Sequence, residues 1–383
     1  MKKIERAIAL LMCLVLLVSV VTGCSKTADV ASAEVEEPVS AEAEDVEEPE
    51  VAEETVVEYP YIVTALRSLS NPYHQQVIQG MELYAEKMGI PEDHVLTITH
   101  DNNTDKLLSD MKALITKYDG NVVFQVDPNQ KSDLIAIAEM CEEAGVYWVS
   151  IWERPDEVKV SDYQYWVAAI NFGNYESGYL SAKALFESMG GEGEVWFLDG
   201  TKGHAAAEGR RAGAEQALAE YPGITLIGYE DCGWEKTKAY NSANNAVTAN
   251  PNLKGIWSAN DNMGMGAIEA LRAKNLVGTI GVAGVNAIPD MIDAIKNGEA
   301  VATISTDPLW QGGISLAMAV DAKLGKYDPS TVEEDHRYWS ASVVLIDTSN
   351  VQDYIDNYLN SMPDIDYTDY YAGKYVGPGE EIH

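Results

Sequence analysis

The sequence predicts an α/β protein built from parallel β-sheets with helices on both faces. From Tyr59 onward, short β-branched runs alternate with longer stretches of helical periodicity. Such alternation of strand and helix is typical of parallel sheets covered by helices. About ten strands over about 290 residues are too many for one ordinary domain, so we expect two domains.

The expected elements follow one another along the chain. Strands are predicted at residues 61–66, 95–99, 122–126, 147–152, 166–170, 194–198, 225–229, 256–258, 280–285 and 301–305. Helical periodicity between these strands is clear at residues 75–88, 105–118 and 177–188.

The first 23 residues are predicted to be a secretion signal. A basic amino-terminal segment precedes an apolar stretch at residues 7–21, which is too short for an ordinary membrane span. The sequence Val-Thr-Gly-Cys at residues 21–24 resembles the bacterial lipobox, which implies that Cys24 carries lipid and becomes the mature amino terminus. We therefore expect an extracytoplasmic protein anchored to the cell membrane by its lipid. An uncleaved membrane anchor with an incidental cysteine is the alternative, and it also exports the protein.

Residues 24–58 are predicted to be a disordered acidic tether between the lipid and the folded body. The segment consists mostly of Ala, Val, Glu, Pro and Ser without amphipathic periodicity, so it cannot bury enough apolar surface to fold. The formal net charge of the chain is −35, and twelve acidic residues between Glu34 and Glu58 supply about a third of it. The rest of the chain is also acidic, which argues against nucleic acid and anionic lipid surfaces as partners.

The stretch from Ile256 to Leu271 predicts a ligand contact. A short strand delivers Asn260 and Asp261 to the start of a helix, at the carboxyl edge of a parallel sheet. Ligands of open α/β sheets bind at that edge, and an amide beside a carboxylate suits a vicinal diol. Asp261 is also a good helix N-cap, and that role alone would explain it, so Asn260 is the better candidate.

Several segments at strand ends resemble one protein family. They are Ser70-Asn71-Pro72-Tyr73, Val126-Asp127-Pro128, Trp152-Glu153-Arg154, residues 174–178, residues 200–213, Trp234-Glu235, Asn260-Asp261 and Gly284-Val285-Asn286. In order and spacing they resemble the type I periplasmic binding proteins, specifically the ribose- and galactose-binding branch, over about residues 61–348.

The resemblance implies two Rossmann-like lobes that are joined by a three-crossover hinge and hold a ligand in the cleft between them. The N-terminal lobe would contain residues 59–168 and 308–340. The C-terminal lobe would contain residues 169–307 and 341–350, with a last strand near residues 342–346. Residues 351–383 form an acidic, tyrosine-rich C-terminal extension whose role the sequence does not indicate.

A saccharide site needs aromatic platforms and planar polar groups that hold hydroxyls. Trp152 and Trp234 are expected at strand ends next to charged residues, where a core tryptophan is less expected. Tyr73 follows Asn71-Pro72, so its backbone leaves the turn in a fixed direction and its ring can face the cleft. Packing at the rim of a sheet is the alternative for each tryptophan, and capping of the first helix is the alternative for the tyrosine.

Polar candidates come from the resemblance. Asn286 stands where the family more often has Asp, and Glu208 stands where related sugar binders often have Arg. If Glu208 reaches the cleft, the ligand would carry an amine; if it faces solvent, it has no such meaning. Glu153 and Arg154 would pair with each other or with the ligand. The full set of expected ligand-binding residues is Asn71, Tyr73, Asp127, Trp152, Glu153, Arg154, Glu208, Trp234, Asn260, Asn286 and Thr306.

Enzyme motifs are absent from the sequence. There is no Walker loop, no His-Glu-x-x-His and no Gly-x-Ser-x-Gly, and Glu269 occupies the third glycine position of a dinucleotide fingerprint. The six histidines form no ligand-spaced pair, so we expect no catalytic residue, no metal and no cofactor.

Cys141 lies on a helical pattern and is expected to be a buried thiol. A transcription regulator of related fold would need a basic N-terminal helix-turn-helix instead of the acidic tether.

The sequence therefore predicts a lipid-anchored substrate-binding protein of an ABC importer that binds a monosaccharide or related polyol. Its partners would be the permease subunits and, through the lipid, the membrane. One alternative is a ligand-binding surface sensor for a membrane signalling partner. Another is the same importer role for a nucleoside or an amine.

Overall fold

The computed structural model describes residues 57–155, 157–361 and 363–374. The expected signal peptide, Cys24 and residues 25–56 of the expected tether lie outside these residues. Within the described ranges, no helix is both long enough and apolar enough to cross a membrane.

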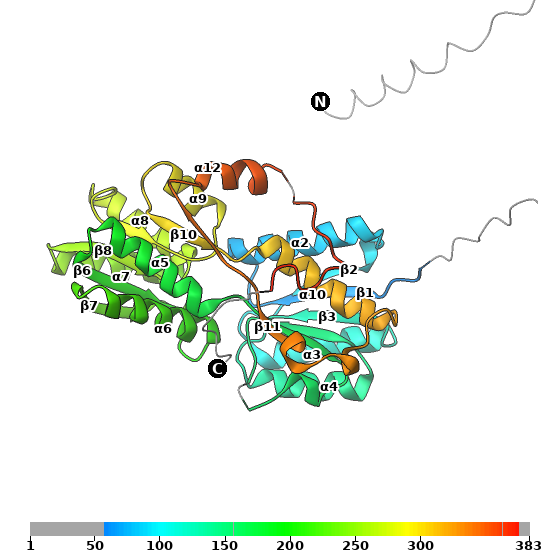
Figure 1. Ribbon diagram of the computed structural model, residues 1–383. Helices are drawn as coiled ribbons and strands as arrows, with labels where there is room; N and C mark the ends of the chain where they lie inside the picture. Colours follow the sequence, from blue (N-terminus) through cyan, green and yellow to red (C-terminus); the bar gives the residue numbers. More distant parts are fainter. Residues whose placement is uncertain (1–56, 156, 362, 375–383) are drawn as a thin grey trace, which may run out of the picture. The chain divides into compact units, whose positions relative to one another are not determined.

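Two six-stranded sheets form the centres of two lobes (Figure 1). The sheet of the N-terminal lobe has the strand order β11-β5-β4-β3-β1-β2, and all its pairs are parallel. Its strands are β1 (Tyr61–Leu66), β2 (Val95–Thr99), β3 (Val122–Val126), β4 (Trp148–Ile151), β5 (Trp166–Asn171) and β11 (Tyr338–Ser340).

The sheet of the C-terminal lobe has the order β12-β10-β9-β8-β6-β7, in which only β12 runs antiparallel to its neighbour. Its strands are β6 (Glu192–Asp199), β7 (Gly223–Asp231), β8 (Leu253–Ser258), β9 (Gly281–Ala283), β10 (Ala302–Ser305) and β12 (Val344–Asp347).

Helices flank each sheet. Those of the N-terminal lobe are α2 (Pro72–Met88), α3 (Thr104–Lys117), α4 (Asp133–Ala144), α10 (Pro308–Lys323) and the short α11 (Glu334–Arg337). Those of the C-terminal lobe are α5 (Asn174–Ser188), α6 (Ala205–Glu220), α7 (Lys236–Ala249), α8 (Asp261–Ala273), α9 (Pro289–Lys296) and the short α12 (Val351–Tyr354). Short helical turns occur at η1 (Glu92–His94), η2 (Val160–Asp162), η3 (Pro329–Thr331) and η4 (Ile355–Leu359).

The chain crosses between the lobes three times, so the predicted α/β architecture with a three-crossover hinge is confirmed. The crossovers are residues 172–173 between β5 and α5, residues 306–307 between β10 and α10, and residues 341–343 between β11 and β12. Strand β5 continues to Asn171, so the first crossover follows the expected lobe boundary at Ala168 by a few residues. Strand β9 is shorter than predicted and ends at Ala283, and the loop after it carries Asn286 and Ala287 at positive φ of 121° and 51°.

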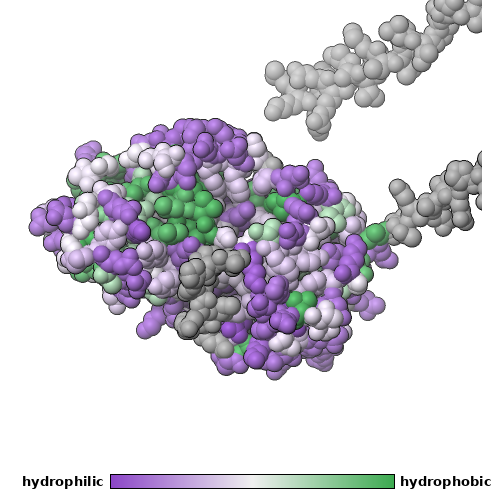
Figure 2. All heavy atoms as spheres, in the orientation of Figure 1, coloured by the Kyte–Doolittle hydropathy of each residue, from purple (hydrophilic) through white to green (hydrophobic). Residues whose placement is uncertain are grey.

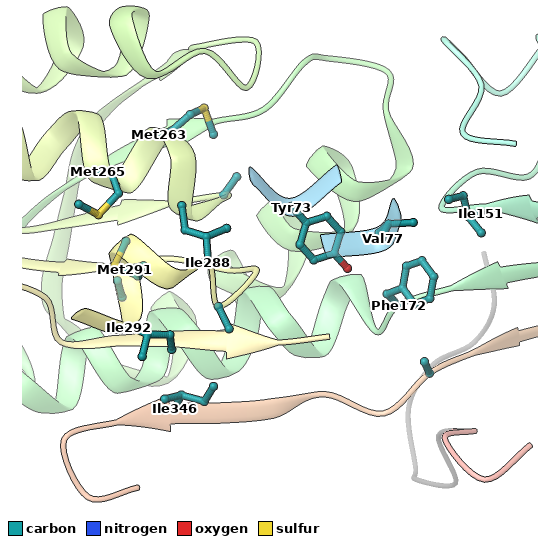
Figure 3. Packing of buried hydrophobic residues seen from close by; sticks show 14 of the residues in the cluster. Tyr73, Val77, Ile151, Phe172, Met263, Met265, Ile288, Met291, Ile292 and Ile346 are labelled. Atoms are coloured by element: carbon teal, nitrogen blue, oxygen red, sulfur yellow. The ribbon is translucent and has the colours of Figure 1, made fainter. Parts of the chain in front are cut away.

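Buried apolar side chains are continuous from one lobe to the other through the crossovers. Figure 3 shows Tyr73 and Val77 of α2 near Phe172 of the first crossover, with Met291 and Ile346 of the C-terminal lobe beyond them. Hydrophilic residues cover most of the face seen in Figure 2, and an apolar area lies on the C-terminal lobe. The thiols of Cys141 and Cys232 are both buried and free.

Helices α5 and α6 pack with their backbones in contact, and this packing positions a residue of the site. A Cβ atom added to Gly178 would lie 1.9 Å from the carbonyl oxygen of Arg210. A Cβ atom added to Gly213 would lie 1.9 Å from the carbonyl oxygen of Tyr175. Both distances are shorter than any van der Waals contact, so this approach requires glycine at both positions.

The C-terminal extension contacts both lobes, and we call its described residues 351–361 and 363–374 the C-terminal strap. Helix α12 lies beside α9 on the C-terminal lobe, and the Tyr358 hydroxyl donates to Asp307 in the second crossover (Figure 1). Farther along, the buried Tyr367 packs edge-on against Tyr84 of α2, with ring centroids 5.0 Å apart. The backbone N–H of Ser342 in the third crossover donates to the Gly373 carbonyl at 2.7 Å.

Candidate functional site

A cleft of about 1000 Å³ opens between the lobes, at the carboxyl ends of the strands of both sheets. Asparagine is the most frequent residue on its walls, and amides both donate and accept hydrogen bonds. The asparagines come from both lobes: Asn71, Asn102, Asn129, Asn174, Asn260, Asn262 and Asn286. The cleft is therefore rich in groups that can hold ligand hydroxyls from two sides.

An aromatic wall, made of Tyr73, His74 and Trp152, forms the N-terminal side of the cleft. The Trp152 ring stacks on His74 with centroids 5.4 Å apart, and its centroid lies 5.7 Å from that of Tyr73. Trp152 has a φ of 73°, in the left-handed region that residues other than glycine rarely adopt. Strain of this kind persists where the surrounding structure enforces it, most often at functional sites.

Trp234 faces this wall from the C-terminal lobe and has the same unusual backbone, with a φ of 65°. Its indole Nε1 donates to Nδ1 of His204 at 3.1 Å. The two tryptophans that the sequence predicted for the site thus line the cleft from opposite lobes.

Arg210 of α6 is a cleft residue that the sequence analysis did not select. Its Nη1 donates to the Ala259 carbonyl at 2.8 Å and lies 3.5 Å from Oδ1 of Asn286. No carboxylate forms an ion pair with it in the described parts of the chain, and its Nε has no partner there. Burial lowers the pKa of its guanidinium to about 10. A buried cation with unused donors is suited to a ligand that offers oxygen acceptors.

Asp127 and Glu153 pair with Arg67, which follows β1 and lines the cleft. Nη2 of Arg67 lies 2.6 Å from Oδ1 of Asp127 and 3.3 Å from Oε1 of Glu153, and both carboxylate side chains are fully buried. Burial raises the pKa of Asp127 to about 7, although Arg67 acts in the opposite direction. The predicted pair between Glu153 and Arg154 is therefore replaced by a pair between Glu153 and Arg67.

The same cluster joins the two lobes. Oε2 of Glu153 accepts a hydrogen bond from the backbone N–H of Ala205, at the start of α6, at 3.1 Å. Nη1 of Arg67 lies 2.7 Å from Nδ1 of His204, the nitrogen that also accepts from Trp234. Because two donors face this nitrogen, it carries no proton, and burial lowers the pKa of His204 to about 4.

Asn260 and Asn286 line the cleft, whereas Thr306 is fully buried behind the cleft residue Tyr73. Oδ1 of Asn260 accepts from the Met263 backbone at 2.9 Å, so Asn260 rather than Asp261 caps α8. Asp261 instead accepts from the Ile288 backbone and from the Thr303 hydroxyl, which holds the loop that carries Asn286. The hydroxyl of Thr306 lies 2.6 Å from that of Tyr73.

Five of the eleven expected ligand-binding residues are not on the cleft walls. Asp127, Glu153 and Thr306 are buried behind the walls, and the side chains of Arg154 and Glu208 lie elsewhere. The guanidinium of Arg154 lies 4.0 Å from the ring centroid of Tyr338 and donates to the Val158 carbonyl. The side chain of Glu208 is 55% exposed, and its carboxylate lies 3.7 Å from Nζ of Lys131. The acidic group that suggested an amine ligand is therefore on the surface.

Comparison with known proteins identifies the family. The model of the "Periplasmic binding protein domain" family matches residues 62–326. The chain belongs to the periplasmic binding protein family. It is 29% identical to the D-allose-binding periplasmic protein of Escherichia coli over 267 residues, which cover 69% of this chain and 85% of that protein. It is 26% identical to the D-apiose import binding protein of Actinobacillus succinogenes over 74% of this chain and 87% of that protein.

Solved structures of similar fold agree with membership of the periplasmic binding protein family. A twin-arginine translocation pathway signal protein from Burkholderia phytofirmans has a TM-score of 0.78 and 36% identity, and the match covers 83% of this chain and 99% of that one. A periplasmic solute binding protein of an ABC transporter from Actinobacillus succinogenes, with bound D-allose, has a TM-score of 0.69 and 28% identity, over 77% of this chain and all of that one. The two relatives named above are binding proteins rather than enzymes, in agreement with the expectation of no catalytic activity.

Proposed function

We propose that this periplasmic binding protein is the substrate-binding protein of an ABC importer and binds a monosaccharide or related polyol between its lobes. The observation that carries the proposal is the cleft itself, in which two strained tryptophans from opposite lobes accompany seven asparagines and Arg210, a buried cation without an ion pair among the described residues. Aromatic rings pack on the apolar faces of sugar rings, while amides and a guanidinium hold the hydroxyls. Relatives named for D-allose and D-apiose, and a similar structure with bound D-allose, support this class of ligand.

The charges around the cleft favour a neutral ligand over an amine. A cationic ligand needs a free carboxylate, but Asp127 and Glu153 are paired with Arg67. Asp231 lies on the exposed rim of the cleft, and its carboxylate accepts hydrogen bonds from the backbone N–H groups of Lys202 and Gly233. At the rim, Glu235 pairs with Lys238 at 2.8 Å. With Glu208 on the surface, the nucleoside or amine alternative keeps only Asn286, a neutral amide on the cleft wall, as its motive.

In the proposed mechanism the ligand bridges the lobes and shifts an equilibrium between open and closed forms about the three crossovers. The contacts of Arg67 with His204 and of Glu153 with Ala205 hold the closed form. The permease subunits would recognise that form. Lipid on Cys24 would keep the protein at the outer face of the cell membrane.

The first experiment is thermal unfolding of the chain from Ser25 in the presence of pentoses, hexoses, polyols, nucleosides and amines. A ligand at a hundred times its dissociation constant adds roughly 2.7 kcal/mol to the free energy of unfolding, so the melting temperature rises by several degrees. We expect a sugar or polyol to produce this shift, and we expect Trp234→Ala to lose it while the protein still unfolds cooperatively. A response to nucleosides or amines alone contradicts the proposal.

The importer role needs a separate measurement. Cells that lack this gene should lose uptake of the radiolabelled sugar that stabilises the protein. Normal uptake together with a lost transcriptional response to that sugar would instead identify a surface sensor.

A further inference from the structure

We propose that Gln311 is a positioning residue of the ligand site, which holds the aromatic wall in place and connects it to the second crossover. The inference rests on the proposed function, because it concerns how that site is kept ready for a ligand. Gln311 does not line the cleft, so it acts through Tyr73 and Trp152.

The side chain of Gln311 is fully buried in the first turn of α10, immediately after the second crossover. Its Oε1 accepts from the Tyr73 hydroxyl at 2.8 Å and from Nε1 of Trp152 at 3.3 Å. Its Nε2 donates to the carbonyl of Thr306. One amide therefore bonds to two members of the aromatic wall and to the hinge.

Trp152 depends on such support because its backbone is strained. At a φ of 73° the residue keeps its conformation only while neighbouring groups enforce it. His74 stacks on the indole, and Phe172 meets it edge-on with ring centroids 6.1 Å apart. The hydrogen bond to Gln311 fixes the direction in which the indole N–H points. Without that bond the indole N–H of the half-buried Trp152 would also lose its acceptor.

The aromatic wall touches two of the three crossovers. Phe172 belongs to the first crossover, and Thr306, whose hydroxyl lies 2.6 Å from that of Tyr73, belongs to the second. Gln311 itself is fixed to the N-terminal lobe, since its backbone carbonyl accepts from Nε2 of Gln125 on β3 at 3.0 Å. Gln311 thus keeps the wall in its binding geometry relative to the N-terminal sheet while the crossovers bend, which lowers the ordering cost of ligand binding.

The test uses the full-length chain in detergent, with the variants Gln311→Met and Gln311→Glu. Methionine has nearly the same length and volume as glutamine but makes none of the three hydrogen bonds, whereas glutamate retains the acceptor for Tyr73 and Trp152. Ser181→Ala is the matched control, because Ser181 accepts from the buried indole of Trp257 at 2.9 Å, away from the cleft. The Ser181→Ala variant should have a lower free energy of unfolding but an unchanged affinity for the ligand.

The first readout needs no ligand. In protein labelled with ¹⁵N-tryptophan, the indole N–H resonance of Trp152 is assigned by its loss in Trp152→Phe. We expect it to move and to exchange faster with solvent in Gln311→Met, and to stay closer to its original position in Gln311→Glu. An unchanged resonance and exchange rate in Gln311→Met would overturn the proposal. If Gln311→Met does not fold, Gln311→Leu, which also lacks an acceptor for Tyr73 and Trp152, takes its place in this comparison.

The second readout is the affinity for D-allose, the sugar bound in a similar structure. We expect Gln311→Met to weaken binding roughly 10- to 100-fold, and to weaken it much less in the Trp152→Phe background, since the two residues act through one contact. A loss no larger than that of Ser181→Ala, or the same loss in both backgrounds, contradicts the positioning role. If D-allose does not bind the unmodified chain, that result counts against the proposed ligand class, and the indole resonance still tests Gln311.

Discussion

Replacement of Arg67 by methionine tests the electrostatic cluster at the cleft. In Arg67→Met the fully buried carboxylates of Asp127 and Glu153 lose the cation that lies 2.6 and 3.3 Å from them. Removing one partner of a buried ion pair costs about 3–5 kcal/mol, because a buried charge is left without compensation. The free energy of unfolding of native proteins is about 5–15 kcal/mol, so we expect Arg67→Met to lose a large fraction of its stability.

The loss should depend on pH in a direction that the structure fixes. Burial already raises the pKa of Asp127 to about 7, and removal of Arg67 removes the effect that opposes this rise. A carboxyl whose pKa is raised by folding stabilises the folded state at low pH, and this contribution is lost as the pH rises through the folded-state pKa. The deficit of Arg67→Met should therefore be full at pH 8 and smaller at pH 5, where the carboxyls take up protons.

The measurement is urea unfolding at both pH values, with Arg272→Met as the control. Arg272 pairs with Glu299 on the surface, where the two side chains are 45% and 27% exposed, so its replacement should cost about 0–1 kcal/mol. A deficit for Arg67→Met no larger than that of the control at pH 8, or one that is equal at pH 5 and pH 8, would refute the reasoning.

Four further predictions address other parts of the molecule. Burial raises the pKa of Asp261 to about 7, so the stability that its protonated form contributes is lost as the pH rises through that value. In Asp261→Asn the free energy of unfolding should therefore fall by up to about 4 kcal/mol less between pH 4 and pH 8 than in the unmodified chain. Melting temperatures that fall equally in the variant and the unmodified chain would contradict this. Gly213→Ala should cost about 1–3 kcal/mol and weaken sugar binding, because the added methyl group meets a backbone oxygen of α5; Ala212→Ser, on the exposed side of α6, should change neither unfolding nor affinity. Arg210→Met should weaken D-allose binding by about 10- to 100-fold in calorimetry, since a hydrogen bond to a charged group contributes about 1.5–3 kcal/mol. The melting temperature of the variant should not fall, and a loss of stability would instead indicate a structural role for Arg210. Truncation after Asn350 should lower the free energy of urea unfolding by roughly 3–5 kcal/mol, because it uncovers the surface that Tyr367 buries, and an unchanged unfolding curve would show that the C-terminal strap adds no stability.

Most of the fold could be predicted from the sequence because each strand is a short β-branched run and each helix has a clear period. Strand β11 was missed, since three residues that follow a charged stretch carry no periodic signal. Trp152 and Trp234 were found because a tryptophan beside charged residues at a strand end is unusual. All of these features depend on residues that are neighbours in the chain, so they can be recognised from the sequence alone.

The charged part of the site could not be predicted in the same way. Arg67, Asp127 and Glu153 follow three different strands, and their pairing depends on side-chain directions that no spacing encodes. Glu208 and Arg210 lie two positions apart on α6, so they project from nearly opposite sides of the helix. Which of them meets the cleft depends on the contact of α6 with α5. Gly213, three residues after Arg210 and therefore on the same face, was the signal for that contact.

The discontinuous N-terminal lobe has a consequence for protein synthesis. Five strands of its sheet, β1 to β5, precede Asn171, but the helix α10 that covers the sheet, the edge strand β11 and the C-terminal strap that ends at Lys374 all follow residue 307. At about 5–20 residues per second, the ribosome needs roughly 10–40 s to make the intervening chain. During that interval the nascent lobe exposes an apolar sheet face, so its protection by chaperones matters most before α10 (Pro308–Lys323) has been translated.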